Sequence, residues 1–216
     1  SPHEVTYKRK APSSEYKKTF SITYPKIKAA TPALSRKIEA LLSYENAFDL
    51  TLAEELKESD WLDEATYEVE YNGKGALSVA LSIAGSAAYP DGSTKYIVID
   101  TKKGTRATAS TDLTNTNGLI AKLNVMLKKE IAAAIKEIKA DPDNADADTE
   151  QLFANKKFGA SDLQSFSINA HGVTFHYDYG FPHVEQALEP AGEFTLSWTE
   201  MKPYLRAGGL LAAVAR

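Results

Sequence analysis

The sequence contains no cysteine. This absence excludes disulfide bonds, thiolate metal sites and cysteine nucleophiles together. It does not fix the cellular compartment, because many envelope proteins also lack cysteine. Any chemistry of the chain must come from its other side chains.

Long apolar runs are also missing. No stretch approaches the ~20 residues needed to span a bilayer, and the N-terminal sequence SPHEVTYKRK has no apolar stretch of the signal-peptide kind. These features predict a soluble chain as given. Because the sequence begins with Ser1 and not Met, we interpret it as a trimmed or mature form, and this leaves the compartment open.

An excess of basic charge is absent as well. The chain has 25 Lys and Arg against 29 Asp and Glu, for a net charge of -4. This balance excludes a nucleic-acid binder with a continuous basic surface. The sequence also lacks a nucleophile elbow, a phosphate-cradling Gly loop, a dinucleotide fingerprint and a His-Glu-x-x-His helix. We therefore predict no cofactor, no metal and no catalytic residue.

The first third of the chain predicts strands followed by helix. The runs VTYKRK and EYKKTFSITYPKI are rich in β-forming residues and predict a hairpin that ends at Tyr24 and Pro25. Thr31 and Pro32 fit an N-cap and a first helical position. The apolar spacing that follows predicts a helical segment to Lys57, with a break near Asn46.

The middle of the chain predicts a meander. In EATYEVEY, apolar and polar residues alternate as a half-buried antiparallel strand requires. NGKG turns the chain back into a second strand, and KYIVID forms a third. The buried face of the second strand should carry Leu77, Val79, Leu81 and Ile83.

The remainder predicts a long helix and more strands. An amphipathic helix from Leu119 to about Lys139 should lie across the sheet. A hairpin turning at His171-Gly172, a last strand GEFTLSW and a short capped helix follow. The fold class is therefore α+β, an antiparallel β-sheet meander packed by at least two α-helices. From its length and composition we expect one compact unit.

The acidic loop after the long helix carries oxygen ligands of the kind that calcium prefers. An EF-hand starting at Asp141 would need Gly at its sixth position and an acid at its twelfth, where the chain has Asp146 and Leu152. The EF-hand motif therefore fails. An irregular calcium site and a solvated loop are the two interpretations left.

The stretch FHYDYGFPHVEQALEP, residues 175–190, gathers most of the candidate chemistry. Strand alternation places His176 and Asp178 on one polar face. Together with His183 they could ligate zinc or orient a general base, as in a metal-dependent hydrolase. An exposed cross-strand contact is the more common outcome for such a pair.

Aromatic residues beside the Pro-fixed turn offer a second interpretation, a binding surface. Core packing is the alternative for each of them. We predict that Tyr179, Phe181 and His183 are exposed and bind a ligand, and we add Tyr89 from the earlier turn YPDGST.

Several segments, read in order, resemble a bacterial cell-envelope domain family of unknown function. Members occur in the extracellular part of the lysozyme-sensing anti-sigma factor RsiV, and related domains accompany peptidoglycan deacetylases of the PdaC type. The segments that carry the resemblance are SITYPKI, EYNGKGALSVALSIAGSAAYPDGSTKYIVIDTKKGT with TDL, LNVMLKKEI, and GVTFHYDYGFPHVEQALEPAGEFTLSWTEMKPYL. Where many relatives have a Gly-Gly-Ala-His-like turn, this chain has Gly85-Ser86-Ala87-Ala88-Tyr89, so that histidine has no counterpart here.

The resemblance implies an extracytoplasmic module with a membrane or lipid tether outside this chain. Our leading interpretation is a non-enzymatic envelope module that binds a wall-acting protein such as lysozyme, or peptidoglycan glycan. The resemblance also implies a PdaC-associated subregion at residues 1–60 and an RsiV-like domain at residues 61–216. Deacetylase activity belongs to a separate catalytic domain in that family, and its metal-binding motifs are absent from this sequence. A metal-dependent hydrolase of cell-wall glycan and a purely structural envelope domain are the alternatives.

Overall fold

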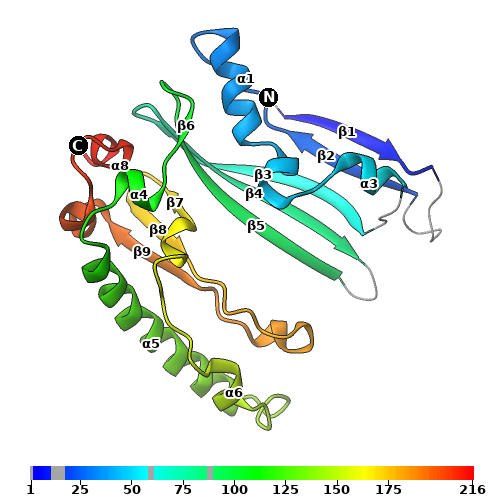
Figure 1. Cartoon of the computed structure of the whole chain (residues 1–216). Helices are drawn as coiled ribbons and strands as arrows, with labels where there is room; N and C mark the ends of the chain where they lie inside the picture. The colour runs from blue at the N-terminus through cyan, green and yellow to red at the C-terminus, as the bar shows by residue number, and fades with distance from the viewer. Residues whose placement is uncertain (1, 11–17, 58–60, 87–89) are drawn as a thin grey trace. The chain divides into compact units, whose positions relative to one another are not determined.

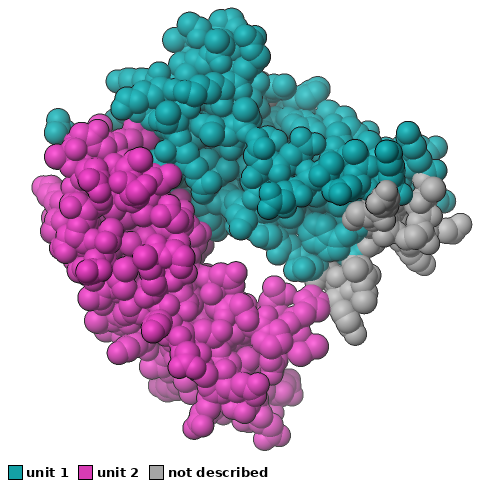
Figure 2. Space-filling view, in the orientation of Figure 1, with its two compact units in different colours: residues 1–107, 167–170, 216 teal, residues 108–166, 171–215 magenta. Residues whose placement is uncertain are grey.

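The computed structural model describes residues 2–10, 18–57, 61–86 and 90–216. The chain divides into two compact units (Figure 2). The first comprises residues 1–107, 167–170 and 216, and the second comprises residues 108–166 and 171–215. The division into subregions at residues 60 and 61 stays a prediction.

The first unit is built on a six-stranded sheet whose strands follow one another in chain order (Figure 1). Neighbouring strands are antiparallel except for the second and third, which are parallel. The sheet confirms the predicted N-terminal hairpin and meander. Its strands are β1 (His3–Lys8), β2 (Thr19–Tyr24), β3 (Leu62–Gly73), β4 (Ala76–Ser86), β5 (Pro90–Asp100) and β6 (Thr105–Arg106).

The alternating pattern of β4 explains how this sheet forms its core. Leu77, Val79, Leu81 and Ile83 are all buried, as the period-two spacing predicts. Ser78, between them, is buried too, and its hydroxyl donates to a Glu70 carboxylate oxygen at 3.0 Å. The opposite face of β4 is thus also covered at this position.

Three short helices connect β2 to β3 and pack on the sheet: α1 (Pro32–Leu41), α2 (Tyr44–Phe48) and α3 (Leu52–Lys57). The Thr31 hydroxyl accepts the Leu34 N–H at 3.2 Å, and Pro32 opens the first turn, which confirms the predicted cap. Ile38 is fully buried against the core of the sheet. The predicted break near Asn46 is instead two breaks, at residues 42–43 and 49–51.

A second, three-stranded sheet has the order β7-β8-β9, and the long helix α5 (Thr116–Ala140) of the second unit contacts β9. The predicted hairpin and last strand are confirmed as β7 (Phe166–Ile168), β8 (Gly172–His176) and β9 (Glu193–Ser197). Shorter elements complete the unit: α4 (Ala109–Asp112), α6 (Thr149–Phe153), α7 (Trp198–Met201), α8 (Leu210–Val214), η2 (Asp162–Gln164), η3 (His183–Leu188) and η4 (Lys202–Tyr204).

Helix α5 buries one side against its unit. Leu119, Leu123, Leu127 and Ile138 are buried, whereas Met126, Ile131 and Ile135 are only half-buried. The apolar stripe predicted from the sequence is therefore confirmed as a face of the helix. None of the helices in the described ranges is both long and apolar enough to cross a membrane.

Candidate functional site

The segment from residue 177 to residue 192, which we call the β8–β9 segment, leaves the end of β8 and returns to β9. It contains the predicted aromatic turn. Its two ends are joined where the Tyr177 N–H donates to the Gly192 carbonyl at 2.8 Å. Gly192 has a φ of 65°, and a Cβ there would lie 2.2 Å from the Tyr177 carbonyl oxygen. The segment is therefore a closed loop that needs glycine at its base.

Tyr179 and Phe181 are buried, with 1% and 8% of their surface exposed. The expectation that both are exposed is wrong. Their rings pack edge to face, with centroids 5.8 Å apart, and each also contacts Phe153 of α6. The aromatic side chains beside the proline turn point inward because the end of α6 supplies an apolar surface for them.

Polar groups fix Tyr179 further. Its hydroxyl donates to a Glu130 carboxylate oxygen at 2.5 Å, and its backbone N–H donates to Glu189 at 3.0 Å. The Lys156 ammonium donates to its carbonyl oxygen and lies 5.7 Å from the centre of the Phe181 ring. Burial, with the neighbouring Glu130, raises the pKa of Tyr179 far above its usual range. The phenol therefore stays a neutral donor.

The tip of the segment is exposed. It begins at Pro182 and continues into η3, where His183 Nδ1 lies 3.2 Å from the Gln186 side-chain oxygen. Val184 is 86% exposed, the highest value among the exposed large hydrophobic residues that the structure describes. The predicted exposure of His183 agrees with the structure. Its role in binding stays a prediction, and Tyr89 lies outside the described residues.

His176, Asp178 and His183 each have a different neighbour. His176 Nδ1 lies 3.9 Å from Glu193, and burial lowers the pKa of His176 to about 4, so the ring is neutral at pH 7. Asp178 accepts the Gly180 N–H at 2.7 Å. Within the described ranges, no three His, Cys, Asp or Glu residues gather closely enough to hold a metal ion.

Acidic side chains surround the base and tip of the β8–β9 segment. Asp178 and Glu193 are exposed, and Glu185 is half-buried. In Figure 1 the acidic loop between α5 and α6 lies at the same end of the second unit as η3 (orange). Across this unit, acidic residues outnumber basic residues. The second unit therefore carries a net negative charge.

Sequence reasoning missed the residues that hold the aromatic base, namely Glu130, Phe153 and Lys156. Glu130 could have been found, because it lies three residues after buried Leu127 and adjoins half-buried Ile131 on α5. A carboxylate beside an apolar stripe needs a donor. No local signal connects Lys156 to a carbonyl oxygen twenty-three residues away.

Fold and segment together define an α+β protein with an exposed turn anchored on buried aromatics. No protein-family model matches the sequence, and neither does any curated protein. The solved structures that resemble the fold include two DUF3298 family proteins. One, from Pseudomonas aeruginosa PAO1, has 13% sequence identity and a TM-score of 0.58, and the match covers 96% of this chain and 94% of that one.

The other, from Bacteroides fragilis NCTC 9343, has 14% identity and a TM-score of 0.58, covering 99% of this chain and 96% of that one. Identities this low show a shared fold alone. The likeness extends over nearly the whole length of both chains, so it includes both units.

Proposed function

We propose that this chain is a non-enzymatic module of the bacterial cell envelope that binds a wall-acting protein such as lysozyme through the tip of the β8–β9 segment. The observation that carries the proposal is the exposed Val184 beside His183, on a turn whose base is fixed by buried Tyr179 and Phe181. A fixed apolar tip loses little conformational freedom on binding, which favours protein recognition.

The chemistry of the segment supports binding more than catalysis. His176 is neutral and largely buried, and Asp178 is occupied by a backbone N–H. A hydrolase would need a base or a metal-bound water beside an open cleft. The three residues of the hydrolase hypothesis instead have separate neighbours.

Charge supports a cationic partner. The acidic residues around the tip would steer a positively charged protein such as lysozyme toward it. The apolar contact at Val184 would then hold the complex when salt screens that attraction. Placement outside the cytoplasm, with a lipid or membrane tether beyond this chain, follows from the resemblance to the envelope family.

Titration calorimetry with a c-type lysozyme tests the proposal, at low and at moderate salt, with peptidoglycan fragments in a parallel cell. We expect saturable binding that weakens with salt but persists. Val184→Lys should weaken binding at least tenfold. Val125→Lys is the matched control, because Val125 is also an exposed valine of this unit, 56% exposed on α5.

An equal loss of lysozyme affinity in Val184→Lys and Val125→Lys would show that the binding surface is not the tip. Binding heat with the peptidoglycan fragments but not with lysozyme would show that the ligand is a glycan and not a protein. No heat from either ligand would leave a structural envelope domain as the better interpretation.

A further inference from the structure

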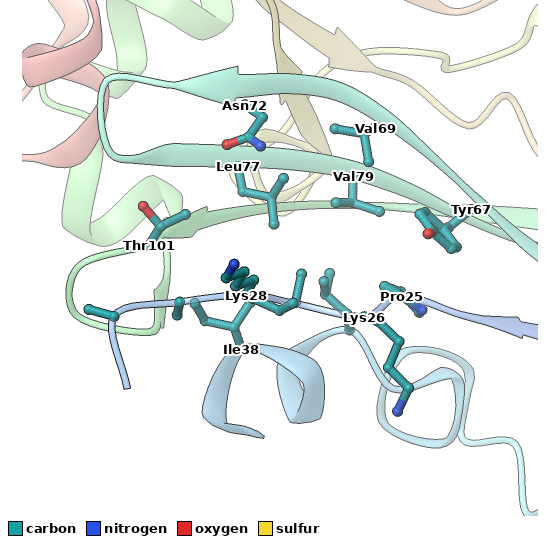
Figure 3. Close-up of a pocket in the computed structure, with 14 residues that line it drawn as sticks. Pro25, Lys26, Lys28, Ile38, Tyr67, Val69, Asn72, Leu77, Val79 and Thr101 are labelled. Atoms are coloured by element: carbon teal, nitrogen blue, oxygen red, sulfur yellow. The ribbon is translucent and has the colours of Figure 1, made fainter. Parts of the chain in front are cut away.

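The first unit contains a cavity of about 460 Å³, which is remote in sequence from the β8–β9 segment (Figure 3). It lies beneath residues 25–30, which we call the strap, between α1 and the face of β3 and β4. Its volume falls in the range of small-molecule sites, roughly 300 to 1,000 Å³.

The strap exists because β2 cannot follow β3 to its end. Pro25, directly after β2, has no N–H to continue the ladder. The strap binds α1 instead: the Ile27 N–H donates to a Glu39 carboxylate oxygen at 3.0 Å, and the Ala29 N–H donates to the Ser35 hydroxyl at 3.0 Å.

The sheet continues without the strap. β2 pairs with β3 only at Ser21 with Glu64 and at Ile22 with Ala65, whereas β3 stays paired with β4 up to Gly73. Past Ala65, therefore, the strap and the sheet separate, and the cavity opens between them. Its position is set by the hydrogen bonds of the strap to α1, so we regard it as built into the fold.

The floor of the cavity is apolar. α1 contributes Ile38, the following turn contributes Leu42, and β4 contributes Leu77 and Val79. All four are buried. Val69 of β3, at the edge of the cavity, is 48% exposed. An apolar body that entered here would remove the exposed surface of Val69 from water and make van der Waals contact with the floor.

The mouth is polar and basic. Asn72 and Thr101 line the cavity, together with Lys26 and Lys28 of the strap. In Figure 3, Lys28 lies on the side of the strap where Leu77 and Thr101 are drawn, whereas the Lys26 side chain extends away from the sheet.

The nearby carboxylates are already occupied. Glu39 accepts the Ile27 N–H, and Asp100 accepts the N–H groups of Lys102 and Lys103 at 2.9 and 3.1 Å. Asp100 also pairs with the Lys103 ammonium at 3.4 Å. No carboxylate of the described residues lies within ion-pair distance of the Lys28 ammonium, which therefore remains available to an anion.

We propose that this cavity binds a small amphiphilic anion, specifically a medium-chain fatty acid. The acyl chain would lie on Leu77, Val79 and Ile38. The carboxylate would accept hydrogen bonds from the Lys28 ammonium and the Asn72 amide. The Lys28 ammonium beside an apolar floor matches one charged end on an apolar chain. This site is independent of the proposed protein-binding tip and does not require it.

Binding of laurate to the whole chain, below its micelle concentration, tests the site by calorimetry. We expect saturable binding of one laurate per chain, at least tenfold weaker binding of dodecanol, and none of dodecyltrimethylammonium. Lys28→Glu should weaken laurate binding at least tenfold. Lys26→Glu, the same charge change two residues away, should change it less than threefold, and circular dichroism should show both variants folded.

Three results would overturn the proposal. Absence of saturable laurate binding would remove the site. Dodecanol binding as tightly as laurate would remove the role of Lys28. Equal losses in Lys28→Glu and Lys26→Glu would show general attraction to a basic surface instead of a built site. The lysozyme titration tests the tip of the β8–β9 segment in the second unit, whereas the laurate titration tests the cavity in the first unit. A negative result in one therefore leaves the other proposal standing.

Discussion

The guanidinium of Arg9 and the carboxylate of Glu55 form an ion pair of 3.2 Å inside the first unit, with only 2% and 7% of their side chains exposed. Arg9 also donates to the Leu62 carbonyl at 2.7 Å and stacks 4.7 Å above the Phe20 ring. One buried cation thereby joins the end of β1 to β2, α3 and the start of β3.

Breaking this pair should be costly. Glu55→Leu leaves the guanidinium buried without its counter-charge, and we expect a loss of about 3–5 kcal/mol in the free energy of unfolding. The double variant Arg9→Met/Glu55→Leu should recover much of that loss, because apolar side chains can replace a buried ion pair. Urea unfolding of the double variant and of both single variants, Arg9→Met and Glu55→Leu, measures the coupling. Losses that simply add would contradict a coupled pair.

The hydroxyl of Tyr179 should contribute to stability through Glu130. Tyr179→Phe removes a buried hydrogen bond to a carboxylate, and we expect a loss of about 1.5–3 kcal/mol. Tyr177→Phe is the matched control, since its hydroxyl accepts the Lys157 N–H at 3.0 Å in an exposed position. The control should lose about 1 kcal/mol or less. Thermal unfolding distinguishes the two, and equal losses would argue against a strong bond to Glu130.

His176 should make stability depend on pH. Its pKa is lowered by burial from 6.5 to about 4 in the folded chain, so the unfolded chain binds the proton first as pH falls. The stabilising effect is complete above pH 6.5 and is lost as pH falls from 6.5 to 4. After allowance for solvent screening, we expect a loss on the order of 2 kcal/mol.

Urea unfolding between pH 7.5 and pH 4 measures this dependence. His176→Gln should flatten it relative to the unsubstituted chain, whereas His183→Gln, at the exposed tip, should leave it unchanged. If His176→Gln keeps the full slope, other groups cause the dependence.

Substitutions at two glycines distinguish the energetic cost of a left-handed backbone from that of a steric clash. Gly192 and Gly208 both have positive φ, of 65° and 80°, but a Cβ at Gly208 meets nothing within 4 Å. Gly208→Ala should therefore cost only the left-handed backbone penalty, about 1–2 kcal/mol. Gly192→Ala should cost a further ~1–3 kcal/mol, because its Cβ collides with the Tyr177 carbonyl. Equal unfolding midpoints would show that the loop base can shift.

Much of the fold could be predicted from local patterns. The alternation in β4, the Thr31 cap and the stripe on α5 each depend on residues within a few positions of one another, so periodicity and capping rules reveal them. The parallel pairing of β2 with β3 could not be predicted, because it joins residues forty-three positions apart across three helices.

The candidate site was less predictable. The strand expected to carry both His176 and Asp178 ends at His176, and the expected exposure of Tyr179 and Phe181 was wrong. Whether an aromatic residue beside a turn points outward depends on what packs above it, here Phe153 and Glu130 from distant helices. The Arg9–Glu55 pair was missed for the same reason, since charged residues buried together leave no periodic signal.

The strand β7 has a consequence for synthesis. Residues 167–170 belong to the first unit, although more than fifty residues of the second unit precede them. There the Ile168 N–H donates to the Ser78 hydroxyl at 3.2 Å. When only residues 1–107 have been synthesised, the first unit is therefore still incomplete. The contacts made through residues 167–170 form only after more than half of the second unit has been synthesised, so neither unit corresponds to a single continuous fragment of the chain.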